Sequence, residues 1–137
     1  TQKPAVPMMK IAVCGAHMEG LALHWQLRER EARLVQRTTS APCYRFYHLH
    51  AHGRIPDRPG MVRVSEGGAA IELEVWEIPQ ASVGSFLEGI GSPLGLGKVE
   101  LADGSKVTGF ICEGLIADTT TDITSFGSWR AWLDAQL

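Results

Sequence analysis

The segment from residue 13 to residue 20 reads Val13-Cys14-Gly15-Ala16-His17-Met18-Glu19-Gly20. It follows the apolar strand pattern of residues 11–13 and precedes an amphipathic helix pattern, which predicts a strand, a glycine-containing loop and a helix. Glycine lets the backbone turn tightly and approach a ligand, and free N–H groups of such a loop can converge on an anion. His17 adds a side chain that titrates near neutral pH. The segment is therefore a candidate active-site loop, or only a turn that the chain needs between two elements.

The remainder of the chain alternates strand patterns with helix patterns. Period-two alternation and turn residues predict strands over 32–39, 44–49, 61–64, 70–78, 98–101 and 106–112, the last two joined by the hairpin dipeptide Asp103-Gly104. Apolar spacing of three and four predicts helices near 23–27, over 83–90 and over 126–133, and a loop is predicted over 50–59. Within 70–78, we expect Glu72, Glu74 and Trp76 to face water. Strands this closely hairpinned predict an α+β fold around a curled, mainly antiparallel sheet.

Composition sets the class of protein. The chain has 137 residues, 45% of them hydrophobic, and 13 basic residues against 15 acidic ones, for a net charge of -2. These values are typical of one soluble globular domain, and the scattered basic residues argue against a nucleic-acid partner. Every apolar run is far shorter than the ~20 residues that span a bilayer, so we expect no membrane association. We interpret residues 1–8 as a linker, the cut end of a longer protein or a cloning remnant, and residues 9–137 as one domain.

The cysteines and histidines form no recognisable metal motif. Cys14, Cys43 and Cys112 are odd in number and far apart, which argues against a disulfide framework and for a reducing cytoplasm. The histidines at 48, 50 and 52 share period-two spacing, but such spacing in a polar loop is usually solvated, and the sequence brings no other ligand cluster to it. We therefore expect no metal and no cofactor.

Seven blocks spread along the chain from Lys10 onward carry a resemblance to a known family. They read Val13-Cys14-Gly15-Ala16-His17-Met18, Gln26-Leu27, Ala41-Pro42-x-Tyr44-Arg45, Pro93-Leu94-Gly95-Leu96-Gly97, Val99-Glu100-Leu101-x-Asp103-Gly104, Gly109-Phe110-x-Cys112-Glu113 and Asp122-Ile123-Thr124-x-Phe126-Gly127-x-Trp129-Arg130. Together they resemble the C-terminal domain of allophanate hydrolase, also present in urea amidolyase, within the gamma-glutamylcyclotransferase-like superfamily. The resemblance implies a small, mainly antiparallel or mixed β-barrel flanked by helices, with a pocket at the element that contains His17.

The resemblance also implies a function. In that family a separate amidase domain releases ammonia from allophanate, and the C-terminal domain is held to decarboxylate the N-carboxycarbamate that remains. We expect the amidase half to be absent from this chain. The implied partners are a small anionic carbamate-type substrate, an amidase domain of the same or a partner chain and, as an open alternative, a second copy in a homodimer.

Two other functions stay beside this one. The domain can instead be a non-catalytic module that assembles or stabilises the amidase, because such species also lose carbon dioxide without an enzyme. A gamma-glutamylcyclotransferase is the least favoured function, because Cys14-Gly15-Ala16-His17 stands where those enzymes carry Tyr-Gly-Ser-Leu. Their glutamate could be imitated by Glu88.

The implied chemistry assigns roles to individual residues. Loss of carbon dioxide from a carbamate-like dianion needs a pocket that tolerates carboxylates and a proton for the leaving nitrogen. We assign catalysis to His17, which we expect to be an exposed loop side chain, and anion binding to the loop's backbone amides. The substrate-binding candidates are Gly15, Ala16, Met18, Gly20, Tyr44 and Arg45. Arg45 has a second interpretation as a surface arginine paired with a carboxylate. Glu113 either lines the mouth of the pocket or is a polar residue at a hairpin end, and His24 is given no role.

Overall fold

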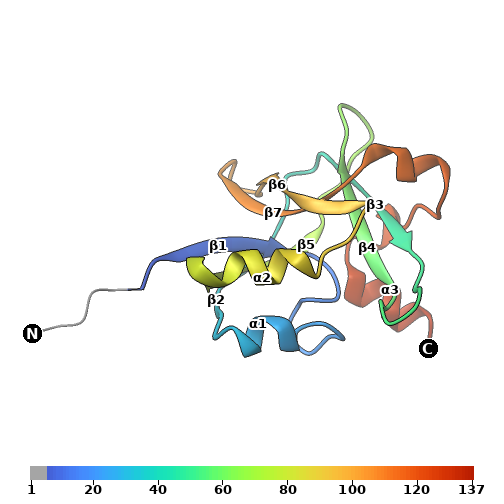
Figure 1. The fold of residues 1–137 in the computed structure, drawn as a ribbon. Coiled ribbons are helices and arrows are strands. Elements are labelled where there is room, and N and C mark those ends of the chain that lie inside the picture. Colours follow the sequence, from blue (N-terminus) through green and yellow to red (C-terminus); the bar gives the residue numbers. More distant parts are fainter. Residues whose placement is uncertain (1–5) are drawn as a thin grey trace, which may run out of the picture.

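The computed structural model describes residues 6–137 and has two groups of strands (Figure 1). The five-stranded sheet has the order β2-β5-β1-β7-β6, and β3 and β4 form a separate ribbon. The strands are β1 (Met8–Val13), β2 (Arg33–Thr39), β3 (Tyr44–Leu49), β4 (Arg58–Arg63), β5 (Glu72–Pro79), β6 (Leu94–Glu100) and β7 (Lys106–Cys112). The α-helices are α1 (Trp25–Glu29), α2 (Val83–Glu88) and α3 (Trp129–Ala135). None of the helices within residues 6–137 has the length and apolar character needed to cross a membrane.

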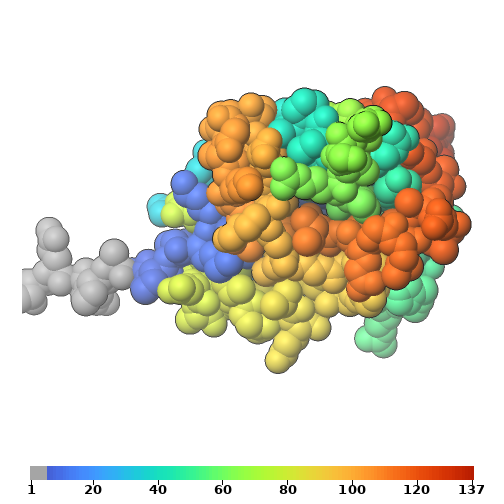
Figure 2. Space-filling model, turned by 90° about the horizontal axis from the view of Figure 1, so that it is seen from above, coloured from blue at the N-terminus to red at the C-terminus, as the bar shows by residue number. Residues whose placement is uncertain are grey.

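Strand pairing confirms the predicted α+β fold. All strand pairs are antiparallel except β1 with β7, which meet in parallel at Ala12 and Gly109. The two edge strands of the sheet meet at one corner, where Ser40 bridges Leu101 and the Ala41 N–H donates to the Glu100 carbonyl at 2.9 Å. Figure 2 shows this corner as the turn after β6 lying against the segment near residue 40. The sheet therefore curls strongly, as the sequence predicts.

Strand β1 lies at the centre of the sheet and carries the loop that contains His17. Its apolar residues Ile11, Ala12 and Val13 are buried between the neighbouring strands. The parallel contact with β7 is close, since a Cβ atom on Gly109 would lie 2.8 Å from the Ala12 Cβ atom. Only glycine fits there, so the end of β1 and the start of the loop have a fixed position against β7.

Several predicted boundaries differ from the structure. Strand β6, predicted over 98–101, already begins at Leu94. The predicted 50–59 loop ends early, because β4 already begins at Arg58 and pairs with the end of β3. The predicted helix over 126–133 is divided, because Gly127 adopts a left-handed φ of 67° after a 3-10 turn at Thr124–Phe126. Helix α3 starts only after it, with the Ser128 hydroxyl accepting from the Ala131 N–H.

The prediction that Glu72, Glu74 and Trp76 on β5 face water was wrong for Glu74 and Trp76. Glu74 is 2% exposed and Trp76 is 6% exposed, because the His17 loop and α3 cover this face. The Glu74 carboxylate accepts hydrogen bonds from the Glu19 N–H (2.9 Å), the Trp76 indole (3.0 Å) and Arg130 (2.9 Å). A buried carboxylate therefore joins β5, the His17 loop and α3 at one point.

The balance of burial and hydrogen bonding sets the charge state of Glu74. Burial alone would raise the pKa of this carboxyl, but the hydrogen bonds from Glu19, Trp76 and Arg130 bring the pKa below its ordinary value. The stabilisation is therefore complete above the unfolded-state pKa of about 4.3, and it is lost as pH falls through the folded-state pKa.

We expect Glu74→Gln to lower the free energy of unfolding by about 1–3 kcal/mol at pH 7, because charge-assisted hydrogen bonds are lost inside the protein. Urea denaturation measures this value. The control is Glu72→Gln on the same strand, whose side chain is 42% exposed and whose loss should cost much less. Equal losses in the two variants would contradict the role assigned to Glu74.

Candidate functional site

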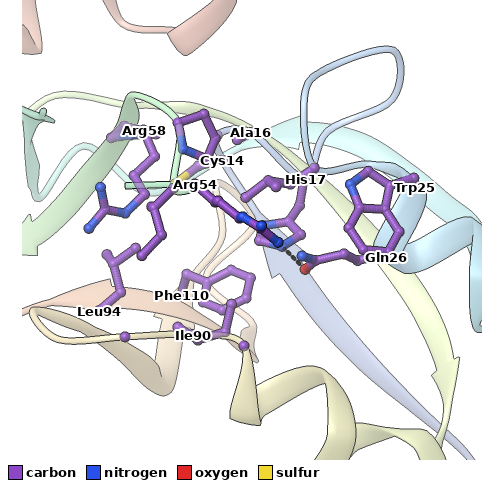
Figure 3. Close-up of a pocket in the computed structure, with 17 residues that line it drawn as sticks. Cys14, Ala16, His17, Trp25, Gln26, Arg54, Arg58, Ile90, Leu94 and Phe110 are labelled. Carbon is purple, nitrogen blue, oxygen red and sulfur yellow. Dashed lines mark hydrogen bonds between the residues drawn. The ribbon is translucent and has the colours of Figure 1, made fainter. Parts of the chain in front are cut away.

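A cavity of about 280 Å³ lies beside the His17 loop (Figure 3). Its walls come from the loop after β1, the start of α1, the 54–59 segment, the turn after α2, and β6 and β7. The polar or titratable side chains on its wall belong to Cys14, His17, Trp25, Gln26, Arg54 and Arg58. The rest of the wall is glycine or apolar, so the site is a small, largely apolar chamber with a few polar groups, as is typical of small-molecule sites.

His17 is buried in the wall of this cavity and is not the exposed loop side chain that the sequence predicts. It is 8% exposed, and its ring lies 5.1 Å from the Phe86 ring and 5.3 Å from the Phe110 ring, measured between centroids. Burial lowers the pKa of His17 to about 4, although the hydrogen bond to Gln26 opposes this shift. The imidazole is therefore neutral at pH 7 in the unliganded protein.

Gln26 fixes the orientation of the His17 ring. The His17 Nε2 atom lies 2.8 Å from the Gln26 Oε1 atom, and we assign the proton to Nε2 because an amide oxygen only accepts. The Nδ1 atom then carries the lone pair. The buried His24 side chain also holds this loop, because its Nδ1 atom lies 2.9 Å from the His17 carbonyl oxygen. The ring thus offers one fixed basic nitrogen that can take up a proton.

Two arginines give the cavity a positive charge. Arg54, from the segment between β3 and β4, runs toward His17 and Gln26, whereas Arg58, the first residue of β4, lines the wall with its guanidinium pointing away from His17 (Figure 3). No aspartate or glutamate lines the cavity. Arg58 is 8% exposed and donates to the His50 carbonyl at 3.3 Å, which holds its side chain. Burial lowers the pKa of Arg58, but a guanidinium keeps its charge at neutral pH. The arrangement is suited to carboxylate ligands.

The thiols near the cavity are poor nucleophiles. Burial raises the pKa of Cys14 to about 12 and that of Cys112 to about 11, so both thiols stay protonated near neutral pH. A nucleophile must be a thiolate to react well. Covalent catalysis by Cys14, the thiol on the cavity wall, is therefore not supported.

The structure places only part of the predicted site at the cavity. Gly15, Ala16 and His17 line it, whereas Met18 is fully buried in the core and Gly20 lies on the surface with a φ of 82°. The predicted backbone cradle is also incomplete. The Met18 N–H donates to the Gly15 carbonyl at 2.9 Å, and the Glu19 N–H donates to Glu74. These amides stabilise the loop itself and are not free for a ligand.

The two predicted residues on β3 lie away from the cavity. Tyr44 is fully buried, and its hydroxyl accepts from the Glu100 N–H at 2.9 Å, so it joins β3 to β6. The Arg45 Nε donates to Asp122 at 2.8 Å, which corresponds to the alternative of a surface ion pair. The hydrogen bond to Asp122 raises the pKa of Arg45.

Residue-by-residue reasoning missed Arg54, Arg58 and Gln26. The two arginines lie in the predicted 50–59 loop, and their only signal was its charge, because nothing in the sequence tells that β3 and β4 return this segment over the His17 loop. Gln26 stands nine residues after His17 and was known only as part of a family motif. Glu88, the residue compared with the cyclotransferase glutamate, is exposed and lies outside the cavity. Glu113 is also exposed and outside the cavity.

Comparisons with known proteins agree with the resemblance. The model of the family described as allophanate hydrolase C-terminal domain matches residues 9–134. The urea amidolyase of Saccharomyces cerevisiae is 40% identical over 129 residues, which are 92% of this chain and 7% of that protein. The chain thus spans only a small part of the curated relatives it matches.

Solved structures share the fold. The S177A variant of Kluyveromyces lactis allophanate hydrolase is 36% identical with a TM-score of 0.90, over 96% of this chain and 22% of that one. The E. coli protein c4763, described as specific to uropathogenic strains, is 32% identical with a TM-score of 0.85, over 93% of this chain and 97% of that one. A gamma-glutamyl cyclotransferase shares the fold alone, at 12% identity and a TM-score of 0.56.

We expect the His17 imidazole of the unliganded protein to titrate near pH 4, with neutral His17 stabilising the fold above its unfolded-state pKa of about 6.5. This contribution is lost as pH falls toward and through the folded-state pKa, because protons then bind the unfolded chain more strongly. NMR of the histidine rings against pH measures the pKa. Gln26→Ala should lower it further, and a His17 pKa near 6.5 in the wild-type protein would contradict the burial described above.

Proposed function

Because the chain belongs to the allophanate hydrolase C-terminal domain family, we propose that its His17 cavity binds N-carboxycarbamate and accelerates loss of carbon dioxide from it. The observation that carries this proposal is the charge of the cavity wall. Two guanidinium groups, a neutral imidazole and no carboxylate line the cavity, and N-carboxycarbamate is a small dianion. Apolar surroundings strengthen the attraction between such groups and a bound anion.

The arginines and the imidazole have separate tasks in this mechanism. Arg54 and Arg58 bind the two carboxylates of the substrate, since a guanidinium matches carboxylate geometry with paired hydrogen bonds. The nitrogen between the carboxylates must gain a proton before it can leave. When it does, its bond to one carboxylate carbon breaks, carbon dioxide departs and carbamate remains. The mechanism consumes one proton and needs no nucleophile, which is consistent with the protonated thiol of Cys14.

His17 supplies that proton. Its pKa of about 4 in the unliganded protein comes from burial, and a dianion beside the ring favours the charged imidazolium and raises the pKa. Substrate binding therefore brings a proton to Nδ1, while Gln26 keeps Nε2 in place. The imidazolium then transfers this proton to the substrate nitrogen.

The test is the rate of carbon dioxide release from freshly generated N-carboxycarbamate, with and without the protein. We expect the wild-type chain to accelerate release. In His17→Gln the catalysed rate should fall by about 10²–10⁴-fold, the usual contribution of general acid catalysis. Glutamine keeps a polar side chain of similar reach but takes up no proton. His17→Ala is a poorer choice, because it would also leave a space between Phe86 and Phe110.

Two arginine variants complete this design. Arg58→Gln should weaken apparent substrate binding, whereas the matched control Arg45→Gln changes a surface arginine outside the cavity and should leave the rate unchanged. Circular dichroism melts establish that each variant is folded. A wild-type chain that does not accelerate release would overturn the proposal and favour the alternative of a module that assembles or stabilises an amidase.

A further inference from the structure

A second cluster of polar side chains lies at the base of the 50–57 hairpin loop. His48, His50 and Asp57 each offer one ligand atom, and these three atoms all lie within 4.8 Å of one another. None of the three lines the His17 cavity. The decarboxylation proposed for the cavity uses none of these three side chains.

Strand register explains why these residues meet. In the β3–β4 ribbon, His48 stands opposite Pro59 and Leu49 opposite Arg58, and His52 bridges Ile55 beyond the ladder in the same register. Continuing this register across the gap places His50 opposite Asp57. His48 lies two residues earlier on the same face, within reach of Asp57 along the diagonal. The sequence shows only the histidines, and Asp57 reaches them because the hairpin folds back.

The cluster is held on a rigid support. The His48 ring lies 4.4 Å from the Trp132 ring and 4.3 Å from the His50 ring, measured between centroids. The Asp57 Oδ1 accepts from the Ala51 N–H at 3.1 Å and lies 2.8 Å from the His48 Nε2. The hydrogen bond to His48 also helps to keep the pKa of Asp57 below its ordinary value, so the group is a carboxylate at neutral pH. His50 and Asp57 face solvent.

We propose that His48, His50 and Asp57 together bind one divalent transition-metal ion of the zinc class. Two imidazoles and a carboxylate suit Zn²⁺, and three protein ligands leave a further position for water. Two atoms that bind one tetrahedral zinc ion at about 2.0 Å stand about 3.3 Å apart. The three atoms here lie within 4.8 Å of one another, and the exposed His50 and Asp57 side chains are free to rotate toward that spacing.

This proposal replaces the sequence-based expectation of no metal. That expectation rested on the absence of another ligand near the histidines, and the structure supplies Asp57 as that ligand. The site is open to solvent on one side, so the ion exchanges readily and chelators remove it. Bound there, it joins the last residues of β3 to the segment before β4 and so stabilises the hairpin.

The test is calorimetric titration of the untagged full chain with zinc chloride. We expect saturable binding of one ion per chain, reversed by EDTA, with affinity falling by about tenfold or more in His50→Ala and in Asp57→Asn. The matched control is His52→Ala, which removes a histidine from the same loop but outside the cluster and should leave the affinity unchanged. Binding that survives in both cluster variants, that is lost in His52→Ala, or that never saturates at millimolar zinc overturns the proposal.

A second measurement needs no variant. In NMR spectra of the wild-type chain, zinc should shift the ring signals of His48 and His50 and leave those of His17 and His24 in place. Shifts at His17 instead would place the ion in the cavity and overturn the proposed cluster. The activity of the cavity is not needed for either measurement, so the two proposals fail or succeed separately.

Discussion

The buried carboxylate of Glu74 is the constraint that places the candidate site. It accepts hydrogen bonds from the Glu19 backbone and from Arg130, and Arg130 also donates to the Glu19 carbonyl at 2.8 Å. The segment that carries His17 is thereby fixed to β5 on one side and to α3 on the other. These hydrogen bonds limit the conformations of the loop, and a functional site needs such a rigid support. The Glu74 hydrogen bonds therefore hold the loop that carries His17 in position beside the cavity.

Burial and the few polar side chains on the wall together determine the charge of the cavity. Burial between Phe86 and Phe110 leaves the His17 imidazole neutral, while Arg54 and Arg58 on the cavity wall keep their charge. The cavity wall is thus positive although the imidazole holds no proton, and in the proposed mechanism a bound anion changes both the charge and the protonation. In this mechanism the charge of the ligand controls the protonation of His17, whereas a purely structural histidine outside the site would not respond to the ligand. The positive charge of the cavity wall is the physical reason for proposing a dianionic ligand there.

Sequence reasoning succeeded where local pattern decides the outcome. The hairpin at Asp103-Gly104, the strand before Cys14 and the fold class depend on turn chemistry and on period-two burial, and they were predicted. It failed where distant segments meet, because no local pattern encodes which loop returns over which strand. Glu74 was expected in water for this reason, and Arg54, Arg58 and Asp57 gained their neighbours only through the β3–β4 ribbon. Arg45, in contrast, looked suitable from the sequence but is engaged by Asp122.

The central claim is that the cavity binds a small dicarboxylate and that the bound anion protonates His17. Malonate tests it most directly, because it replaces the N–H of N-carboxycarbamate with a methylene group and does not lose carbon dioxide under mild conditions. NMR titration of the His17 ring in saturating malonate is predicted to give a pKa well above the value of about 4 in the unliganded protein, and Arg58→Gln should weaken the effect. A His17 pKa that stays the same at saturating malonate, or malonate that binds with no change at the cavity residues, would contradict the account.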